Sequence, residues 1–341
     1  MLSCLRIILN RLVIVVLLGS ASAAWAQTDP SDPLSAWNEG TTKTRIITFV
    51  AQVTNPDHPA YRPASERIAV FDNDGTLWAE KPLYVQQVFA VDRIRMMVKE
   101  NPELASKEPY QSVIRQNEMA TNSQMDVVKI DWLNVMKVTH SGMSQDAFRQ
   151  IVADWIKNAR NAKTGRRHID MIYLPMLQLL RYLEANGFTN YIVSGGETEF
   201  MRPWTKAVYG IDTDQVIGTM TKVSVETDKA GQMTLIRKSF SLLNANVNKR
   251  KVISIDQYIG KRPILAVGNS DGDYEMLLWT STNPKGGLSL IVHHTDAARE
   301  FQYDRKSAIG ELDKGLNDTP KYGWQLIDMK NDWSAIFPDS P

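Results

Sequence analysis

The sequence of 341 residues contains a single cysteine, Cys4, and only five histidines. One thiol cannot form a disulfide within the chain, so a disulfide-stabilised scaffold is excluded. No spacing of cysteines and histidines is typical of a metal site. The 19 glycines and 15 prolines are too few for a collagen-like or low-complexity chain. With 43% hydrophobic residues, the chain can form one large domain or a core with an insertion.

The sequence also has no excess of one charge sign. It contains 39 lysines and arginines against 38 aspartates and glutamates, a formal charge of +1. A basic surplus of the kind that favours nucleic acid or an anionic membrane is therefore lacking. We expect no nucleic-acid partner, and the function has to be sought in local motifs.

The first 26 residues have the layout of a secretory signal peptide. Two arginines precede an unbroken apolar run at 12–18, and small residues before Gln27 mark a cleavage site after Ala26. The stretch 12–26 contains 15 residues, fewer than the about 20 of a membrane-spanning helix, although an uncleaved anchor is the alternative. We expect a mature chain in the bacterial periplasm, without a thiol and without membrane attachment.

Several short apolar runs end directly in polar or glycine-rich segments. Continuous apolar strands with such exits are typical of a parallel sheet that is buried on both faces, with its site beyond the carboxyl ends of the strands. The sequence therefore predicts an α/β fold with a Rossmann-like parallel core. The predicted strands lie at 67–71, 191–193, 263–267 and 288–292.

Apolar residues at helical spacing separate these strands. They predict a crossover helix over 171–186 and a long helical insertion after the first strand, far longer than the about 2–6 residues of an ordinary connection. Residues 27–39 are polar, contain two prolines and suggest a flexible leader. The predicted organisation is a signal peptide at 1–26, a leader with a lead-in helix at 27–66, an α/β core at 67–80 and 171–341, a helical cap at 81–170, and a β-hairpin insertion at 216–248.

Two carboxylates follow the first strand. Asp72 and Asp74 share one face of an extended chain, and Gly75 allows the backbone to turn sharply. Such a pair suits Mg²⁺, which takes oxygen ligands, and leaves one carboxylate oxygen free as a nucleophile. An ordinary Asp-Gly turn is the alternative. A calcium loop is excluded, because Leu77 occupies the position where that loop needs glycine.

The segment VFDNDGTL at 70–77 resembles the first motif of the haloacid dehalogenase superfamily, whose phosphatases carry Asp-x-Asp-Gly-Thr after a hydrophobic strand. The family pattern continues with a serine or threonine at a second strand end, a lysine, and an acidic motif after a later strand. Ser194, Lys251 and the segment 268–277 follow in that order. The resemblance covers 68–294. More closely, the chain resembles a group of secreted, phosphoserine phosphatase-like bacterial members that share the motifs FDNDGTLW and GNSxGD, present here at 71–78 and 268–273.

This resemblance implies a phosphomonoesterase that hydrolyses small phosphate esters through a phosphoaspartate. Asp72 would attack phosphorus, and Asp74, with a raised pKa, would protonate the leaving oxygen. Ser194 and Lys251 would bind the phosphoryl oxygens and stabilise their charge. The substrate contacts that the resemblance adds are Thr76, Gly75, Gly195 and Gly196.

The resemblance also implies a Mg²⁺ site formed by Asp72, Asp74, Asn269 and Asp273. Asn269 is a departure, because many members have an aspartate there and an amide brings only a neutral oxygen. The expected metal site therefore has one negative charge fewer than usual. Glu80 is either a further site residue or a surface charge.

Some assignments stay open on the sequence alone. Lys249 and Lys261 compete with Lys251 for the role of the motif lysine. The alternative to a phosphate-binding role for Ser194 is an ordinary capping residue before Gly195 and Gly196. Glu197 is either a site residue or a surface charge. A dehalogenase is disfavoured by the second aspartate of the first motif. The alternatives to a phosphatase are a phosphotransferase with the same intermediate and a non-catalytic phosphate-ester binding protein.

Overall fold

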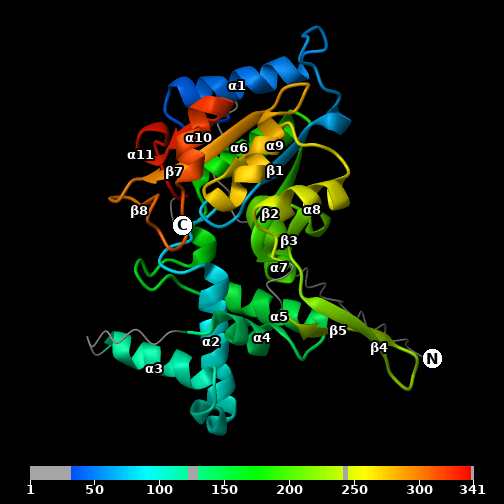
Figure 1. The fold of residues 1–341 in the computed structure, drawn as a ribbon, viewed down its shortest axis with the longest axis vertical. Helices are drawn as coiled ribbons and strands as arrows, with labels where there is room; N and C mark the ends of the chain where they lie inside the picture. Colours follow the sequence, from blue (N-terminus) through cyan, green and yellow to red (C-terminus); the bar gives the residue numbers. More distant parts are fainter. Residues whose placement is uncertain (1–31, 122–129, 241–244, 339–341) are drawn as a thin grey trace, which may run out of the picture.

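The computed structural model describes residues 32–121, 130–240 and 245–338, so the predicted signal peptide lies outside it (Figure 1). Within these residues, a seven-stranded sheet has the order β3-β2-β1-β6-β7-β8, and β9 pairs with β7. All pairs are parallel except β7 with β8. The strands are β1 (Ile68–Phe71), β2 (Thr189–Glu197), β3 (Val216–Thr219), β6 (Leu265–Gly268), β7 (Leu288–Thr295), β8 (Gln302–Tyr303) and β9 (Gln325–Asp328).

Helices cover both faces of this sheet. In β1, Ala69 and Phe71 join a hydrophobic cluster with α1, α6 and α7, whereas Ile68 and Val70 join a second cluster with α8 and α9. This alternation confirms the predicted α/β fold with a mostly parallel core. The helices of the core are α1 (Thr41–Thr54), α6 (Leu174–Ala185), α7 (Thr198–Tyr209), α8 (Lys249–Ile259), α9 (Tyr274–Ser281), α10 (Lys314–Tyr322) and α11 (Met329–Asp332).

The segment between β1 and α6 forms further helices, which lie together below the sheet in Figure 1. Phe89 and Phe148 of this segment pack with Phe200 of α7, which joins the segment to the core. No helix of the described residues is long and apolar enough to cross a membrane. The helices of the segment are α2 (Val85–Glu100), α3 (Tyr110–Thr121), α4 (Trp132–His140) and α5 (Gln145–Ile156).

The predicted hairpin insertion at 216–248 begins later than expected. Val216–Thr219 forms β3, an edge strand of the main sheet that pairs with β2. The hairpin consists of β4 (Lys222–Thr227) and β5 (Met233–Ser239), which pair antiparallel and project from the body (Figure 1). The sequence prediction was wrong for β3, because the short segment VIGT lies directly before a hairpin pattern and reads as part of that pattern.

The predicted flexible leader was also wrong for the residues that the structure describes. Leu34 and Trp37 are buried, and the Trp37 indole nitrogen donates a hydrogen bond to the carbonyl oxygen of Pro175 at 2.9 Å. The rings of Trp37 and Trp333 meet edge to face at 5.9 Å. Two apolar residues in a polar context are enough to attach this segment to the core.

Candidate active site

Asp72 and Asp74 lie directly beyond the carboxyl end of β1. The Asp72 amide donates to the carbonyl oxygen of Val267 in β6 at 2.9 Å, which extends the ladder of β1 by one residue. One carboxylate oxygen of Asp74 accepts a hydrogen bond from the Trp78 indole at 2.8 Å. The strand and this hydrogen bond therefore fix both carboxylates at the edge of the sheet.

Gly75 makes the sharp turn after this pair possible. Its φ is +72°, a left-handed conformation that side chains disfavour. A Cβ at this position would lie 2.0 Å from the side-chain nitrogen of Asn269 and 2.5 Å from a carboxylate oxygen of Glu80. Glycine is thus required both by the backbone and by the side chains that approach it.

Lys251 reaches the Asp72 carboxylate from the first turn of α8. Its ammonium lies 2.7 Å from Asp72 Oδ1 and 2.5 Å from Asp273 Oδ1, and its side chain is buried. Lys249 is exposed, and Lys261 donates to a backbone carbonyl oxygen elsewhere at 2.8 Å. Of the three candidate lysines, Lys251 is therefore the one that lies at the carboxylate pair.

Ser194, Gly195 and Gly196 form the last part of β2. The Ser194 hydroxyl accepts a hydrogen bond from the Gly196 amide at 3.0 Å, and the Ser194 carbonyl accepts one from Asn246 at 3.1 Å. The sequence predicted that the strand ends before Ser194, but β2 continues to Glu197. All three predicted residues face the cavity next to Asp74.

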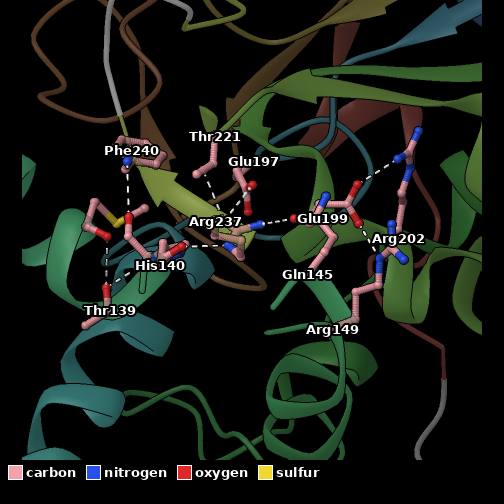
Figure 2. A network of polar contacts seen from close by, with 12 residues as sticks. Thr139, His140, Gln145, Arg149, Glu197, Glu199, Arg202, Thr221, Arg237 and Phe240 are labelled. Carbon is pink, nitrogen blue, oxygen red and sulfur yellow. Dashed lines mark hydrogen bonds and ion pairs between the residues drawn. The ribbon is translucent and has the colours of Figure 1, made fainter. Parts of the chain in front are cut away.

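A buried network holds the end of β2 (Figure 2). Arg237 of the hairpin pairs with Glu197 at 2.9 Å, and it also donates to the His140 carbonyl oxygen at 2.6 Å. Gln86 of α2 accepts from the Glu197 amide at 2.9 Å and contacts the His140 ring at 3.1 Å. Three separate segments are thereby joined behind Ser194. Glu197 is a buried structural charge, and Gln86 and Arg237 are contributors that no sequence motif marked.

Asn269 follows β6 and faces the same cavity. Its side-chain nitrogen donates to Glu80 at 2.8 Å, and its oxygen accepts from Thr76 at 3.2 Å. The second oxygen of Asp273 accepts from the backbone amides of Asn269 and Ser270 at 3.0 and 3.1 Å. Asp273 thus supports both Lys251 and the loop that carries Asn269.

A cavity of about 700 Å³ joins these residues with the inserted helices. Gly75, Thr76 and Asp273 do not line it, and the last two are fully buried. Gly75, Thr76 and Asp273 therefore lie behind the cavity wall, where they do not make the direct contacts that the resemblance implied. The predicted residues that line the cavity are Asp72, Asp74, Ser194, Gly195, Gly196, Lys251 and Asn269, and the inserted segment adds Tyr84, Gln86, Gln87, Trp132, Leu133 and Met136.

The carboxyl groups of the site hold their protons more tightly than usual. Burial and the neighbouring Asp273 raise the pKa of Asp72, although Lys251 opposes this effect. Burial raises the pKa of Asp74 to about 6 and that of Glu80 to about 8. Burial alone would lower the pKa of Lys251, but Asp273 and Asp72 raise it. The Lys251 ammonium therefore stays charged, but it does not offset the burial of Asp72.

These residues fit a magnesium ion. Carboxylate and amide oxygens are its preferred protein ligands, and the residues Asp72, Asp74 and Asn269 line one cavity. No three acidic, histidine or cysteine side chains of the described residues already form a metal-binding group. The amide oxygen of Asn269 and a backbone carbonyl would therefore be needed to complete the ligand set. The buried carboxylates provide the negative charge that such a cation would neutralise.

The sequence model of the haloacid dehalogenase-like hydrolase family matches residues 69–278 of the chain. The chain belongs to this family. No curated protein matches the sequence. Among solved structures, a conserved protein of unknown function from Anaerococcus prevotii is 18% identical with a TM-score of 0.50, over 84% of this chain and 91% of that chain. A probable phosphoserine phosphatase from Vibrio cholerae is 16% identical with a TM-score of 0.33, over 84% and 73%. Such similarities concern the fold, so the activity has to be argued from the site.

Proposed function

We propose that this haloacid dehalogenase-like hydrolase is a Mg²⁺-dependent phosphomonoesterase for small phosphate esters. The observation that carries the proposal is the contact of Asp72 with Lys251 at 2.7 Å, in a cavity that Asp74 and Ser194 also line. A nucleophile, an acid and donors for the phosphoryl oxygens are thus available at one point.

In the first step, a carboxylate oxygen of Asp72 attacks phosphorus. The new oxygen–phosphorus bond forms as the ester bond breaks, and Asp74 gives its proton to the leaving alcohol oxygen. A pKa raised to about 6 suits Asp74 for this role, since the group is protonated in mildly acidic solution. In the second step, Asp74 takes a proton from water, which attacks phosphorus and frees Asp72 and inorganic phosphate.

The remaining side chains stabilise the negative charge on the phosphoryl group. Lys251 keeps the Asp72 carboxylate in place and faces the transferring group, and the Ser194 hydroxyl, whose oxygen accepts from the Gly196 amide, supplies a donor. When bound by Asp72, Asn269 and the Asp74 backbone, Mg²⁺ would supply further positive charge to the same oxygens.

We also propose that residues 81–170 act as a cap and that the mature chain begins at Gln27 in the periplasm. The inserted helices contribute Tyr84, Gln86 and the apolar residues of α4 to the cavity wall, so they are suited to exclude water and to select the alcohol part of the ester. A cavity of about 700 Å³ suits a small molecule.

The test is hydrolysis of a chromogenic aryl phosphate by the chain from Gln27 onward, with Mg²⁺ titrated and then chelated. We expect activity that requires Mg²⁺ and is lost in Asp72→Asn. A folded chain that binds phosphate esters in thermal-shift assays without turning them over would support the binding-protein alternative. Transfer of the phosphoryl group to added alcohols, in preference to water, would support a phosphotransferase.

A further inference from the structure

Glu80 is a buried carboxylate beside the proposed cation site. It lines the cavity with Asp72 and Asp74, yet only 2% of its surface is exposed. One of its oxygens, Oε1, accepts from the side-chain nitrogen of Asn269 at 2.8 Å and from the Tyr303 hydroxyl at 2.8 Å. Glu80 is therefore a part of this site and not the surface charge that the sequence left open.

Two glycines leave the space for this carboxylate. A Cβ at Gly75 would lie 2.5 Å from Glu80 Oε1, and a Cβ at Gly310 would lie 2.0 Å from the same atom. Both glycines have a positive φ, 72° and 67°. Segments far apart in the sequence thus leave room for an acid at this position.

The hydrogen-bond partners of Glu80 in the described residues carry no charge. They are an amide and a phenol, and no lysine, arginine or histidine of the described residues forms an ion pair with it. The neighbouring Lys81 ammonium instead lies over the Tyr303 ring, 4.4 Å from its centroid. A buried carboxylate without a cationic partner is costly, so this arrangement is suited to a site that receives a positive ion.

We propose that Glu80 supplies the negative charge that Asn269 lacks and orients its amide toward the cation. Because Glu80 holds the amide nitrogen, the amide oxygen is directed away from it. That oxygen accepts from Thr76 and keeps a second lone pair for a metal ion. Glu80 is thus a positioning residue of the Mg²⁺ site, and this inference rests on the proposed function. Partners of metal ligands typically contribute about 10- to 100-fold to metal affinity.

The test is calorimetric titration of Mg²⁺ into the chain from Gln27 onward. We expect Glu80→Gln to weaken binding about 10- to 100-fold. Glu80→Gln combined with Asn269→Asp exchanges the acid and the amide, keeps one hydrogen bond between them, and should restore affinity to within a few-fold of the unaltered chain. Glu311→Gln, which removes an exposed acid of the same cavity, is the matched control and should change affinity little.

The outcomes separate this inference from the proposed function. If the unaltered chain binds no Mg²⁺, the proposed cation itself is wrong. If that chain binds and Glu80→Gln binds equally well, or if the exchange variant binds no better than Glu80→Gln, the role of Glu80 is refuted. Equal losses in Glu80→Gln and Glu311→Gln would indicate a general charge effect and would also refute it.

A second variant covers the case in which Glu80→Gln does not fold. Asn269→Asp places two carboxylates at hydrogen-bond distance, where they repel each other without a cation. We expect a lower melting temperature in chelator and a larger stabilisation by Mg²⁺ than in the unaltered chain. The same melting temperature and the same Mg²⁺ stabilisation as the unaltered chain would overturn the inference.

Discussion

The buried pair of Arg237 and Glu197 allows a stability prediction that can be worked from the structure. Arg237 is fully buried, and its guanidinium lies 2.9 Å from Glu197 Oε1 and 3.9 Å from the centre of the Phe148 ring. Arg237→Met keeps much of the apolar contact but leaves the Glu197 carboxylate buried without its cation. Removing one partner of such a pair costs about 3–5 kcal/mol of unfolding free energy.

A double-variant cycle isolates the pair. Glu197→Gln alone leaves the guanidinium of Arg237 buried without its carboxylate and is also expected to destabilise the chain. The two substitutions together remove both charges, so their combined effect should be smaller than the sum by about 1–3 kcal/mol. Urea unfolding followed by circular dichroism and by tryptophan fluorescence measures each free energy. A loss below about 1 kcal/mol in Arg237→Met, or additive losses, would refute the reasoning.

Three further predictions concern the site itself. Lys251→Met should lower kcat for aryl phosphates about 100- to 1,000-fold, and unchanged kcat would remove it from the mechanism. Gly75→Ala should lower the unfolding free energy, measured in urea, by more than Gly231→Ala. Both glycines have a positive φ, but an added Cβ would collide with Asn269 at Gly75 and would meet no atom within 4 Å at Gly231. Equal losses would contradict this. Burial raises the pKa values of Asp74 and Glu80 to about 6 and about 8, from 3.8 and 4.5. The folded chain therefore holds protons that the unfolded chain has released, so stability in chelator should fall as pH rises from about 4 to 8. Urea titrations at pH 5 and pH 8 check this, and equal or greater stability at pH 8 would contradict it.

The sequence predicted the edge of the sheet where the site lies. Parallel strands place their carboxyl ends at one edge, so residues after separate strands meet there even when they are distant in the chain. Asp72, Ser194 and Asn269 line one cavity for this reason, and Lys251 reaches it from the start of the helix before the strand that carries Asn269. The motif and its strand context were sufficient for this part.

The supporting residues could not be predicted in the same way. Whether Thr76 and Asp273 face the cavity or lie behind it depends on side-chain directions that spacing does not determine. Arg237 comes from an alternating hairpin segment that reads as solvent-exposed, and its burial follows from the packing of that hairpin against α4 and α5. The burial of Glu80 likewise depends on Gly310, 230 positions away in the chain.

The most direct test of the central claim is the chemical trapping of the covalent intermediate. The chain is mixed briefly with an aryl phosphate and Mg²⁺, quenched in acid, digested and analysed by mass spectrometry. We predict one added phosphoryl group on the peptide that contains Asp72, with more of it in Asp74→Asn, because that variant lacks the base for hydrolysis. Steady hydrolysis by Asp72→Asn, or a phosphoryl group trapped on another residue, would contradict the account.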